Sequence, residues 1–221
     1  MKSKVPINEK FEIDDLDVLL SLLPTHIRNH SRRVAVCSAI ITEYAVTSMS
    51  LIGISAGMTL PVIAHLGGTC HDIGKLMTRT SRENGNNYSK HPGLGAVLLE
   101  RHKDEYFGNE PEAQMVLDIV RYHHEQADGS GFPEGLKSGK IPVAAGICCA
   151  ANKLDHYMDL GRTPVIDERR VFKKLEAQTG KQFCEYVWVY LERAWPRLMK
   201  KYAFWAEENS EKNLKIFQKN A

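Results

Sequence analysis

Residues 59–76 read TLPVIAHLGGTCHDIGKL and place a histidine and an aspartate at the end of an uncharged run. Thr59 is a residue that caps helices and Pro61 suits a first helical turn, so this stretch predicts a helix that continues to about Leu76. An acid and a base buried side by side are costly unless they are paired or bound to a metal. The pair His71 and Asp72 therefore indicates a metal site inside a helical core.

The uncharged stretch extends back to Tyr44, because residues 44–71 contain no Asp, Glu, Lys or Arg. Such a length can span a bilayer. Glycines and Pro61 interrupt the stretch, and Ser and Thr are scattered through it. We therefore expect two buried helices joined by a loop at residues 52–59, and no membrane span.

Helical periodicity dominates the rest of the chain, while the alternation that marks strands is rare. Helices are predicted at residues 13–23, 28–47, 91–102, 111–125 and 141–160, and two or three more between 167 and 219. The polar segments 78–90 (TRTSRENGNNYSK) and 128–140 (DGSGFPEGLKSGK) are rich in turn residues and predict loops. The expected fold class is all-α: an N-terminal helical lead (1–24), a metal-binding core (25–165) and C-terminal helices packed on it (166–221).

The composition excludes several classes of partner. Of the 221 residues 25% are charged, and the net charge is only +2, which argues against a DNA-binding or membrane-surface protein. The five cysteines are odd in number, lie in apolar runs and form no CxxC pair, which indicates reduced thiols and a cytoplasmic protein. The N-terminal residues contain no apolar run typical of a signal peptide. Cys148 and Cys149 are interpreted as small apolar residues of a buried helix.

Imidazole and carboxylate groups recur along the chain in an order that suits divalent metals. A lone histidine on a helix is more often a hydrogen-bonded residue than a ligand, so the set matters more than its members. Convergence of several such groups can hold two ions that clamp a phosphoester and activate water at neutral pH. The candidates are His30, His71, Asp72, His91, His123 and His124, with Asn152 and Asp155 on a later helix.

Three segments in this order, CHDIGK (70–75), KHPGLGAVLLE (90–100) and YHHEQADGSGFPEGLKSGKIP (122–142), resemble the HD superfamily. The last segment resembles its HD-GYP branch of bacterial cyclic-dinucleotide phosphodiesterases. The resemblance implies an HD-domain helical bundle with two divalent ions, usually iron or manganese, with Mg, Ni or Zn possible in purified protein. It implies that Asp72 bridges the ions and that Lys75 approaches the substrate phosphate. The implied metal ligands are His30, His71, Asp72, His91, His123, His124 and, weakly, Asn152; the implied substrate contacts are Lys75, Asp128, Gly131 and Arg162.

The chain departs from the family pattern at four places. Asn152 stands where the family has an aspartate ligand, so one negative charge is missing. Asp155, three residues later, offers a carboxylate, but the family has an aspartate there too, so we do not expect it to compensate. Phe132 replaces the tyrosine of the GYP motif and loses only a hydroxyl. Arg162 is displaced by one residue from the family's substrate-binding arginine. His26, one turn before His30, either extends the site or is a surface histidine.

The leading hypothesis is a phosphohydrolase that opens a cyclic dinucleotide such as cyclic di-GMP with a metal-bound hydroxide, using Asp72 and Lys75 as catalytic residues. One alternative is a degenerate HD-GYP domain that binds a nucleotide or a protein as a signalling module. Another is an HD enzyme acting on a different nucleotide or phosphoester. A separate sensor or GGDEF-type protein is an expected partner. The aromatic stripe at 188–205 predicts core packing or a homodimer interface.

Overall fold

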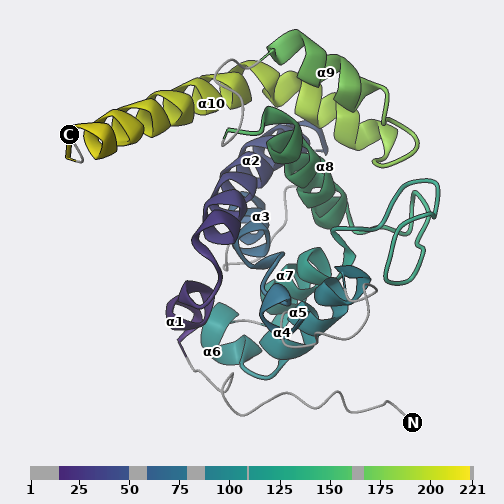
Figure 1. The fold of residues 1–221 in the computed structure, drawn as a ribbon. Helices are drawn as coiled ribbons and strands as arrows, with labels where there is room; N and C mark the ends of the chain where they lie inside the picture. Colours follow the sequence, from purple (N-terminus) through teal and green to yellow (C-terminus); the bar gives the residue numbers. More distant parts are fainter. Residues whose placement is uncertain (1–14, 50–58, 79–87, 109, 161–166, 220–221) are drawn as a thin grey trace.

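The computed structural model describes residues 15–49, 59–78, 88–108, 110–160 and 167–219, and the all-α prediction is confirmed for them (Figure 1). These residues form helices and no β-strand; extended pairing is limited to the isolated bridges Asp128–Lys137 and Thr179–Phe183. No helix among them combines the length and the apolar character that crossing a bilayer requires. The loop predicted at 52–59 and most of the loop predicted at 78–90 lie outside the described residues.

The predicted helices are present with shifted ends, and two short elements were not predicted. The second helix begins at Thr25 rather than at residue 28, and a separate short helix follows the one that starts at His91. The elements are α1 (Leu16–Ser21), α2 (Thr25–Met49), α3 (Leu60–Cys70), α4 (Lys75–Thr78), the 3₁₀ helix η2 (Tyr88–Lys90), α5 (His91–Glu100), α6 (Lys103–Phe107), α7 (Glu110–Tyr122), α8 (Val143–Met158), α9 (Glu168–Glu176) and α10 (Glu185–Lys219).

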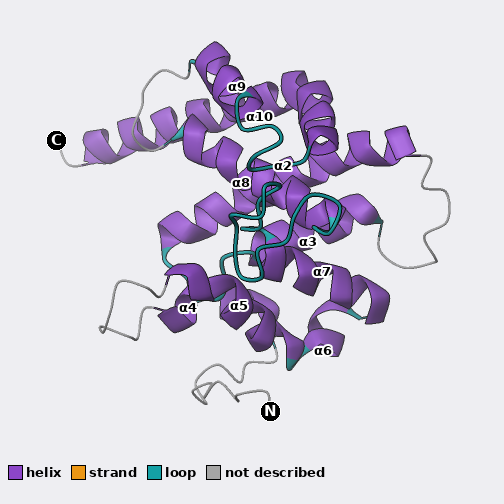
Figure 2. Cartoon of the chain, turned by 90° about the vertical axis from the view of Figure 1, so that its right-hand side faces the viewer, coloured by secondary structure: helices purple, strands orange, loops and turns teal. Residues whose placement is uncertain are grey.

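Helix α2 is the centre of the bundle, and α3, α8 and α10 pack along it (Figure 1). Its fully buried side chains include Val34 and Ile41, which join a core with Ile63 of α3, Leu154 of α8 and Leu198 of α10. Removing this apolar surface from water drives the packing. The loop between α7 and α8 leaves the side of the bundle and is seen face-on in Figure 2. The motifs that carry the candidate metal ligands therefore lie on elements that a shared core holds in place.

The prediction of one helix from Thr59 to Leu76 is wrong, because α3 ends at Cys70 and a tight turn precedes α4. In that turn the Cys70 carbonyl accepts from the Ile73 amide at 2.9 Å, a three-residue spacing typical of 3₁₀ geometry. The cause is the approach of α5. A Cβ at Gly74 would lie 2.0 Å from the His91 carbonyl oxygen and 2.6 Å from the Gly95 nitrogen. The turn places His71 and Asp72 at a helix end rather than at a helix centre.

The C-terminal part contains two helices in the described range, α9 and α10, and the aromatic stripe contributes to the core. Trp188 and Trp195 of α10 contact Phe172 of α9, each with ring centroids 5.0 Å apart. Tyr202 is fully buried against the body of the bundle. The last turns of α10 project beyond the other helices (Figure 1).

Replacing Gly74 with alanine tests whether the close approach of α5 fixes the turn. The added methyl group meets backbone atoms that cannot move aside, so we expect the free energy of unfolding to fall by about 3 kcal/mol, the upper range for overpacking. Gly93→Ala, on α5 with nothing within 4 Å of the new Cβ, is the matched control and should change it by less than about 1 kcal/mol. Urea unfolding with a chelator present measures both variants. Equal stability of the two variants would contradict the packing argument.

Candidate metal centre

Two groups of metal-ligand side chains lie side by side in the interior. The ligand atoms of His30, His71 and Asp72 are within 4.8 Å of one another, and so are those of His91, His123 and His124. Asp72 joins the groups, since its Oδ1 is 3.3 Å from Nε2 of His91. The set comes from α2, the turn after α3, the start of α5 and the end of α7. The structure thus brings together six of the side chains that the sequence analysis singled out.

Backbone carbonyls fix the orientation of three of the imidazoles. Nδ1 of His71 lies 2.7 Å from the Gly68 oxygen, Nδ1 of His123 lies 2.8 Å from the Val120 oxygen, and Nδ1 of His91 lies 2.6 Å from the Tyr88 oxygen. A carbonyl oxygen only accepts, so each Nδ1 carries the proton and donates it. Each Nε2 is left with a lone pair that faces the centre, which is the arrangement that metal-ligating histidines adopt.

Nε2 of His91 and Nε2 of His123 lie 3.3 Å apart. With both protons on the Nδ1 atoms, two lone pairs face each other, and no hydrogen bond can form between them. Burial opposes protonation of His123, whose side chain is fully inaccessible to solvent, and holds its pKa well below the ordinary range. A divalent cation held by His91 and His123 would remove this repulsion, since neutral imidazole is a good ligand for such ions.

Other polar atoms around the centre also lack a partner. Among the described residues, buried side-chain atoms without a hydrogen-bond partner include Nε2 of His30, His71 and His124, Oδ1 of Asp72 and Oδ1 of Asn152. A buried polar atom left unpaired costs about 1–3 kcal/mol. These nitrogen and oxygen donors suit divalent transition metals, so the residues present fit a metal centre.

The charges of the centre favour the ligand forms of these groups. Burial lowers the pKa of His71 to about 3 and holds the pKa of His123 and of His124 far below the ordinary range, so all three rings are neutral. Burial alone would raise the pKa of Asp72, but the surroundings of the carboxylate, including the charged Lys75 ammonium, outweigh burial and keep that pKa well below its usual range. Nζ of Lys75 donates to Oδ2 of Asp72 at 2.6 Å. The centre therefore presents neutral imidazoles around an ionised carboxylate.

Neighbouring side chains engage the carboxylate of Asp155, which was not expected to compensate for Asn152. Its Oδ2 is 2.6 Å from Nδ1 of His30, and Arg33 donates to both of its oxygens at 2.7 and 2.9 Å. Tyr202 donates to Oδ1 at 2.9 Å. Both oxygens of Asp155 are thus engaged, and the carboxylate fixes the orientation of the His30 ring. Asn152 is buried on the same helix, with its amide oxygen unpaired.

The candidate substrate contacts differ in where they lie. Lys75 lines a polar cavity of about 410 Å³ together with His30, Asp72 and Asp155, and His26 is exposed at its edge. The Asp128 carboxylate is directed into its own loop, where it accepts from the amide and hydroxyl of Ser130.

Gly131 serves a close backbone contact, since a Cβ there would lie 2.5 Å from the His124 oxygen. Arg162 lies outside the described residues.

Several residues near the centre escaped the sequence analysis. Arg33 lies one turn after His30 on α2, a spacing that offered a weak signal, whereas Tyr202 is far away in sequence and offered none. Glu125 is buried, and its carboxylate accepts from the amides of Glu134 and Leu136 at 2.7 Å, which holds the loop in place. Phe132 stacks on His124 with ring centroids 4.7 Å apart, so the ring that replaces the family's tyrosine supports a candidate ligand.

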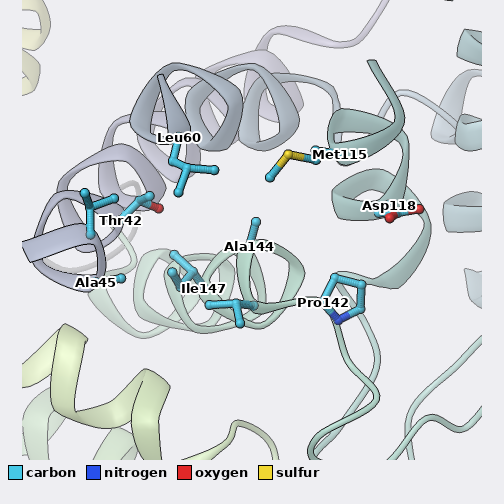
Figure 3. A pocket seen from close by; sticks show the side chains of 10 residues that line it. Thr42, Ala45, Leu60, Met115, Asp118, Pro142, Ala144 and Ile147 are labelled. Carbon is cyan, nitrogen blue, oxygen red and sulfur yellow. The ribbon is translucent and has the colours of Figure 1, made fainter. Parts of the chain in front are cut away.

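A second cavity, of about 320 Å³, lies between α2, α3, α7 and α8 and has a different character (Figure 3). Leu60, Met115, Ala144 and Ile147 line it, and its one charged lining residue, Asp118, accepts a hydrogen bond from Gln114. None of the candidate metal ligands borders this cavity. The apolar cavity offers no group for phosphate chemistry. The polar cavity beside Lys75 is the candidate active site because the candidate ligands His30 and Asp72 line it.

Comparison with known proteins agrees with this geometry. The family model of the HD domain matches residues 27–157. The chain is 31% identical over 97 residues to a cyclic di-GMP phosphodiesterase of Thermotoga maritima, covering 42% of this chain and 24% of that protein. It is 28% identical over 128 residues to the 3'3'-cGAMP-specific phosphodiesterase 2 of Vibrio cholerae, covering 51% of this chain and 22% of that protein. The chain thus spans about a quarter of the length of these relatives.

Among solved structures, Bd1817, an HDG"Y"P protein from Bdellovibrio bacteriovorus, superposes with a TM-score of 0.53. The match covers 82% of this chain and 58% of that one at 21% identity, which supports the shared fold. The names of the two relatives above, phosphodiesterases of cyclic di-GMP and of 3'3'-cGAMP, agree with the resemblance that the sequence motifs indicate.

The buried neutral histidines predict a marked pH dependence of the metal-free protein. Each of these histidines has a lower pKa in the folded protein than in the unfolded chain, so acid protonates the unfolded chain first. The free energy of unfolding therefore falls as pH drops below about 6.5, the pKa of histidine in the unfolded chain. This loss continues down to the folded pKa, about 3 for His71. At pH 5.5 the expected loss is about 1 kcal/mol for each such histidine.

Unfolding by urea with a chelator at pH 7.5 and pH 5.5 measures this loss. His26→Ala removes an exposed histidine and should leave the difference between the two pH values unchanged. A metal-free protein with equal stability at both pH values would show that these rings do not lie buried and neutral together.

Proposed function

Because the chain belongs to the HD domain family, we propose that it is a metal-dependent phosphohydrolase that opens a cyclic dinucleotide of the cyclic di-GMP kind. HD phosphohydrolases bind divalent metals, and the described residues contain two groups that can hold them. The named relatives act on cyclic di-GMP and on 3'3'-cGAMP, which supports a nucleotide second messenger as the substrate.

The observation that carries the proposal is the pair of ligand groups joined by one ionised aspartate. We assign one ion, iron or manganese, to His30, His71 and Asp72, with Asn152 as a weak neutral ligand. We assign the second ion to His91, His123 and His124, with Asp72 shared between the two. When bound, two such ions polarise a phosphoester and supply a nucleophile from water at neutral pH.

The protein's own groups prepare the site for a phosphodiester. The Asp72 carboxylate is almost fully buried and ionised, so it holds its position between the two groups without reorganising. The Lys75 ammonium, 2.6 Å from Asp72, also lines the cavity, where it offsets the negative charge that develops on a reacting phosphate. The Arg33 guanidinium is held by Asp155 on the same cavity wall.

All five cysteines are buried free thiols, which supports a reducing compartment such as the cytoplasm.

Asn152 favours a second candidate function, a module that binds a nucleotide without cleaving it. An amide oxygen is neutral, so the His30 group carries one negative charge fewer than a site with two carboxylates. Weaker metal binding there would leave the centre partly loaded, with the cavity still able to hold a ligand. The two functions differ in whether bound nucleotide is turned over.

Chromatography of cyclic di-GMP incubated with manganese-loaded protein tests the proposed function, with the linear dinucleotide as the expected product. Lys75→Met should lower kcat by about 100-fold or more, because a cation that stabilises the developing charge is lost. Lys140→Met, which removes an exposed lysine from the loop, is the control and should keep the wild-type rate. Nucleotide binding without any product from the metal-loaded wild type would overturn the hydrolase and favour the binding module.

Asn152→Asp should strengthen the His30 group. The added carboxylate supplies charge to a site that lacks it, and we expect the metal Kd to fall at least about tenfold and turnover to rise. Asn29→Asp introduces the same charge at an exposed position of α2 and serves as the matched control. If metal retention and turnover in Asn152→Asp equal those of the wild type, the interpretation of residue 152 as a weakened ligand is wrong.

A further inference from the structure

The C-terminal helix reaches the metal centre through one side chain. Tyr202 on α10 is completely buried, and its hydroxyl donates to Oδ1 of Asp155 at 2.9 Å. The helix lies outside residues 27–157, the range that the HD family model matches. A helix outside the range that the family model matches therefore contacts Asp155, which in turn contacts the candidate ligand His30.

Asp155 in turn determines which nitrogen of His30 faces the centre. Its Oδ2 lies 2.6 Å from Nδ1 of His30, so that nitrogen donates to the carboxylate and Nε2 keeps its lone pair. Nε2 is buried without a hydrogen-bond partner in the described structure. No backbone carbonyl performs this task for His30, in contrast to the histidines at 71, 91 and 123. The orientation of His30 thus depends on how firmly Asp155 is held.

Two groups besides His30 hold the Asp155 carboxylate. Arg33 donates to both oxygens from the same helix as His30, and Tyr202 is the contact that comes from α10. Cys37 of α2 donates to the Tyr202 hydroxyl oxygen at a sulfur–oxygen distance of 3.7 Å, so the hydroxyl is itself fixed in direction. The Tyr202 side chain is fully buried, so its hydroxyl reaches Asp155 from within the core of the bundle.

We propose that Tyr202 is a positioning residue of the metal centre, through which the C-terminal helix sets the affinity of the His30 group for its ion. The inference rests on the metal-dependent function proposed above and extends it to α10. Partners in the second shell of a metal site typically change metal affinity by 10- to 100-fold when they are removed. Loss of the hydroxyl loosens Asp155 and lets the His30 ring turn, while the histidines at 91, 123 and 124 keep their own supports.

Titration of the metal-free protein with Mn²⁺, followed by electron paramagnetic resonance, tests the proposal without any nucleotide. In Tyr202→Phe the affinity for one of the two ions should fall about tenfold, and the signal of that ion should change, while the other ion binds as in the wild type. Tyr190→Phe removes a hydroxyl from a buried position three turns earlier on α10 and should match the wild type. Wild-type affinities and signals for both ions in Tyr202→Phe would overturn the proposal.

A second measurement uses only the wild-type protein, in case the variant folds poorly. Coupling between two sites is reciprocal, so Mn²⁺ binding should slow amide hydrogen exchange around Tyr202 more than around Tyr190. Equal slowing at both positions would overturn the role of Tyr202 alone. If the wild type binds no Mn²⁺, both the proposed function and this extension of it fail. If the wild type binds Mn²⁺ but Tyr202→Phe has no effect, only the extension fails.

Discussion

The structure depends on one constraint: imidazole nitrogens and a carboxylate oxygen that face one another in the interior with no protein donor between them. Nε2 of His91 and Nε2 of His123 lie 3.3 Å apart, and the proton of each ring is on Nδ1, where it is donated to a backbone carbonyl. Such a cluster is unfavourable in a protein core by itself. It becomes favourable when a cation takes the place of the missing donor, which ties the local geometry to metal binding.

The fold meets this constraint by placing ligands at the ends of helices. His71 follows the last residue of α3, His91 begins α5, and His123 and His124 follow α7. The C-terminal ends of α3 and α7 leave backbone carbonyls without helical partners, and these carbonyls accept the Nδ1 protons of His71 and His123, whereas the Tyr88 carbonyl, just before α5, accepts that of His91. His30 lies within α2, where carbonyls are already used, and a carboxylate from α8 takes over the same task. The same chemical requirement is thus met in two ways within one centre.

Much of this arrangement could be predicted from the sequence, because it is encoded locally. The motifs at 70–75, 90–100 and 122–142 carry the candidate ligands in adjacent positions, and helical periodicity gave most of the elements and the all-α class. The end of α3 at Cys70 could not be predicted, because it depends on the close approach of α5 to Gly74, which the local sequence does not indicate. Periodicity reports which face of a helix is buried, but not what lies against it.

The supports of the centre were hidden for a similar reason. The spacing of Asp155 from Asn152 did not indicate its partners, because Arg33 and Tyr202 engage its carboxylate from elements that precede and follow it in the chain. The aromatic stripe correctly indicated core packing, but no pattern distinguished Tyr202 from its apolar neighbours. Long-range hydrogen bonds depend on how whole helices are placed, and that information appears only when the bundle is assembled.

Elemental analysis of protein purified without oxygen tests the central claim most directly, with His71→Ala prepared in parallel. Two joined ligand groups predict about two equivalents of iron or manganese in the wild type. The variant should lose at least the ion that we assign to the group of His30, His71 and Asp72. A wild type that holds no metal, or a variant with the same metal content as the wild type, would contradict the assignment of these side chains to a metal centre.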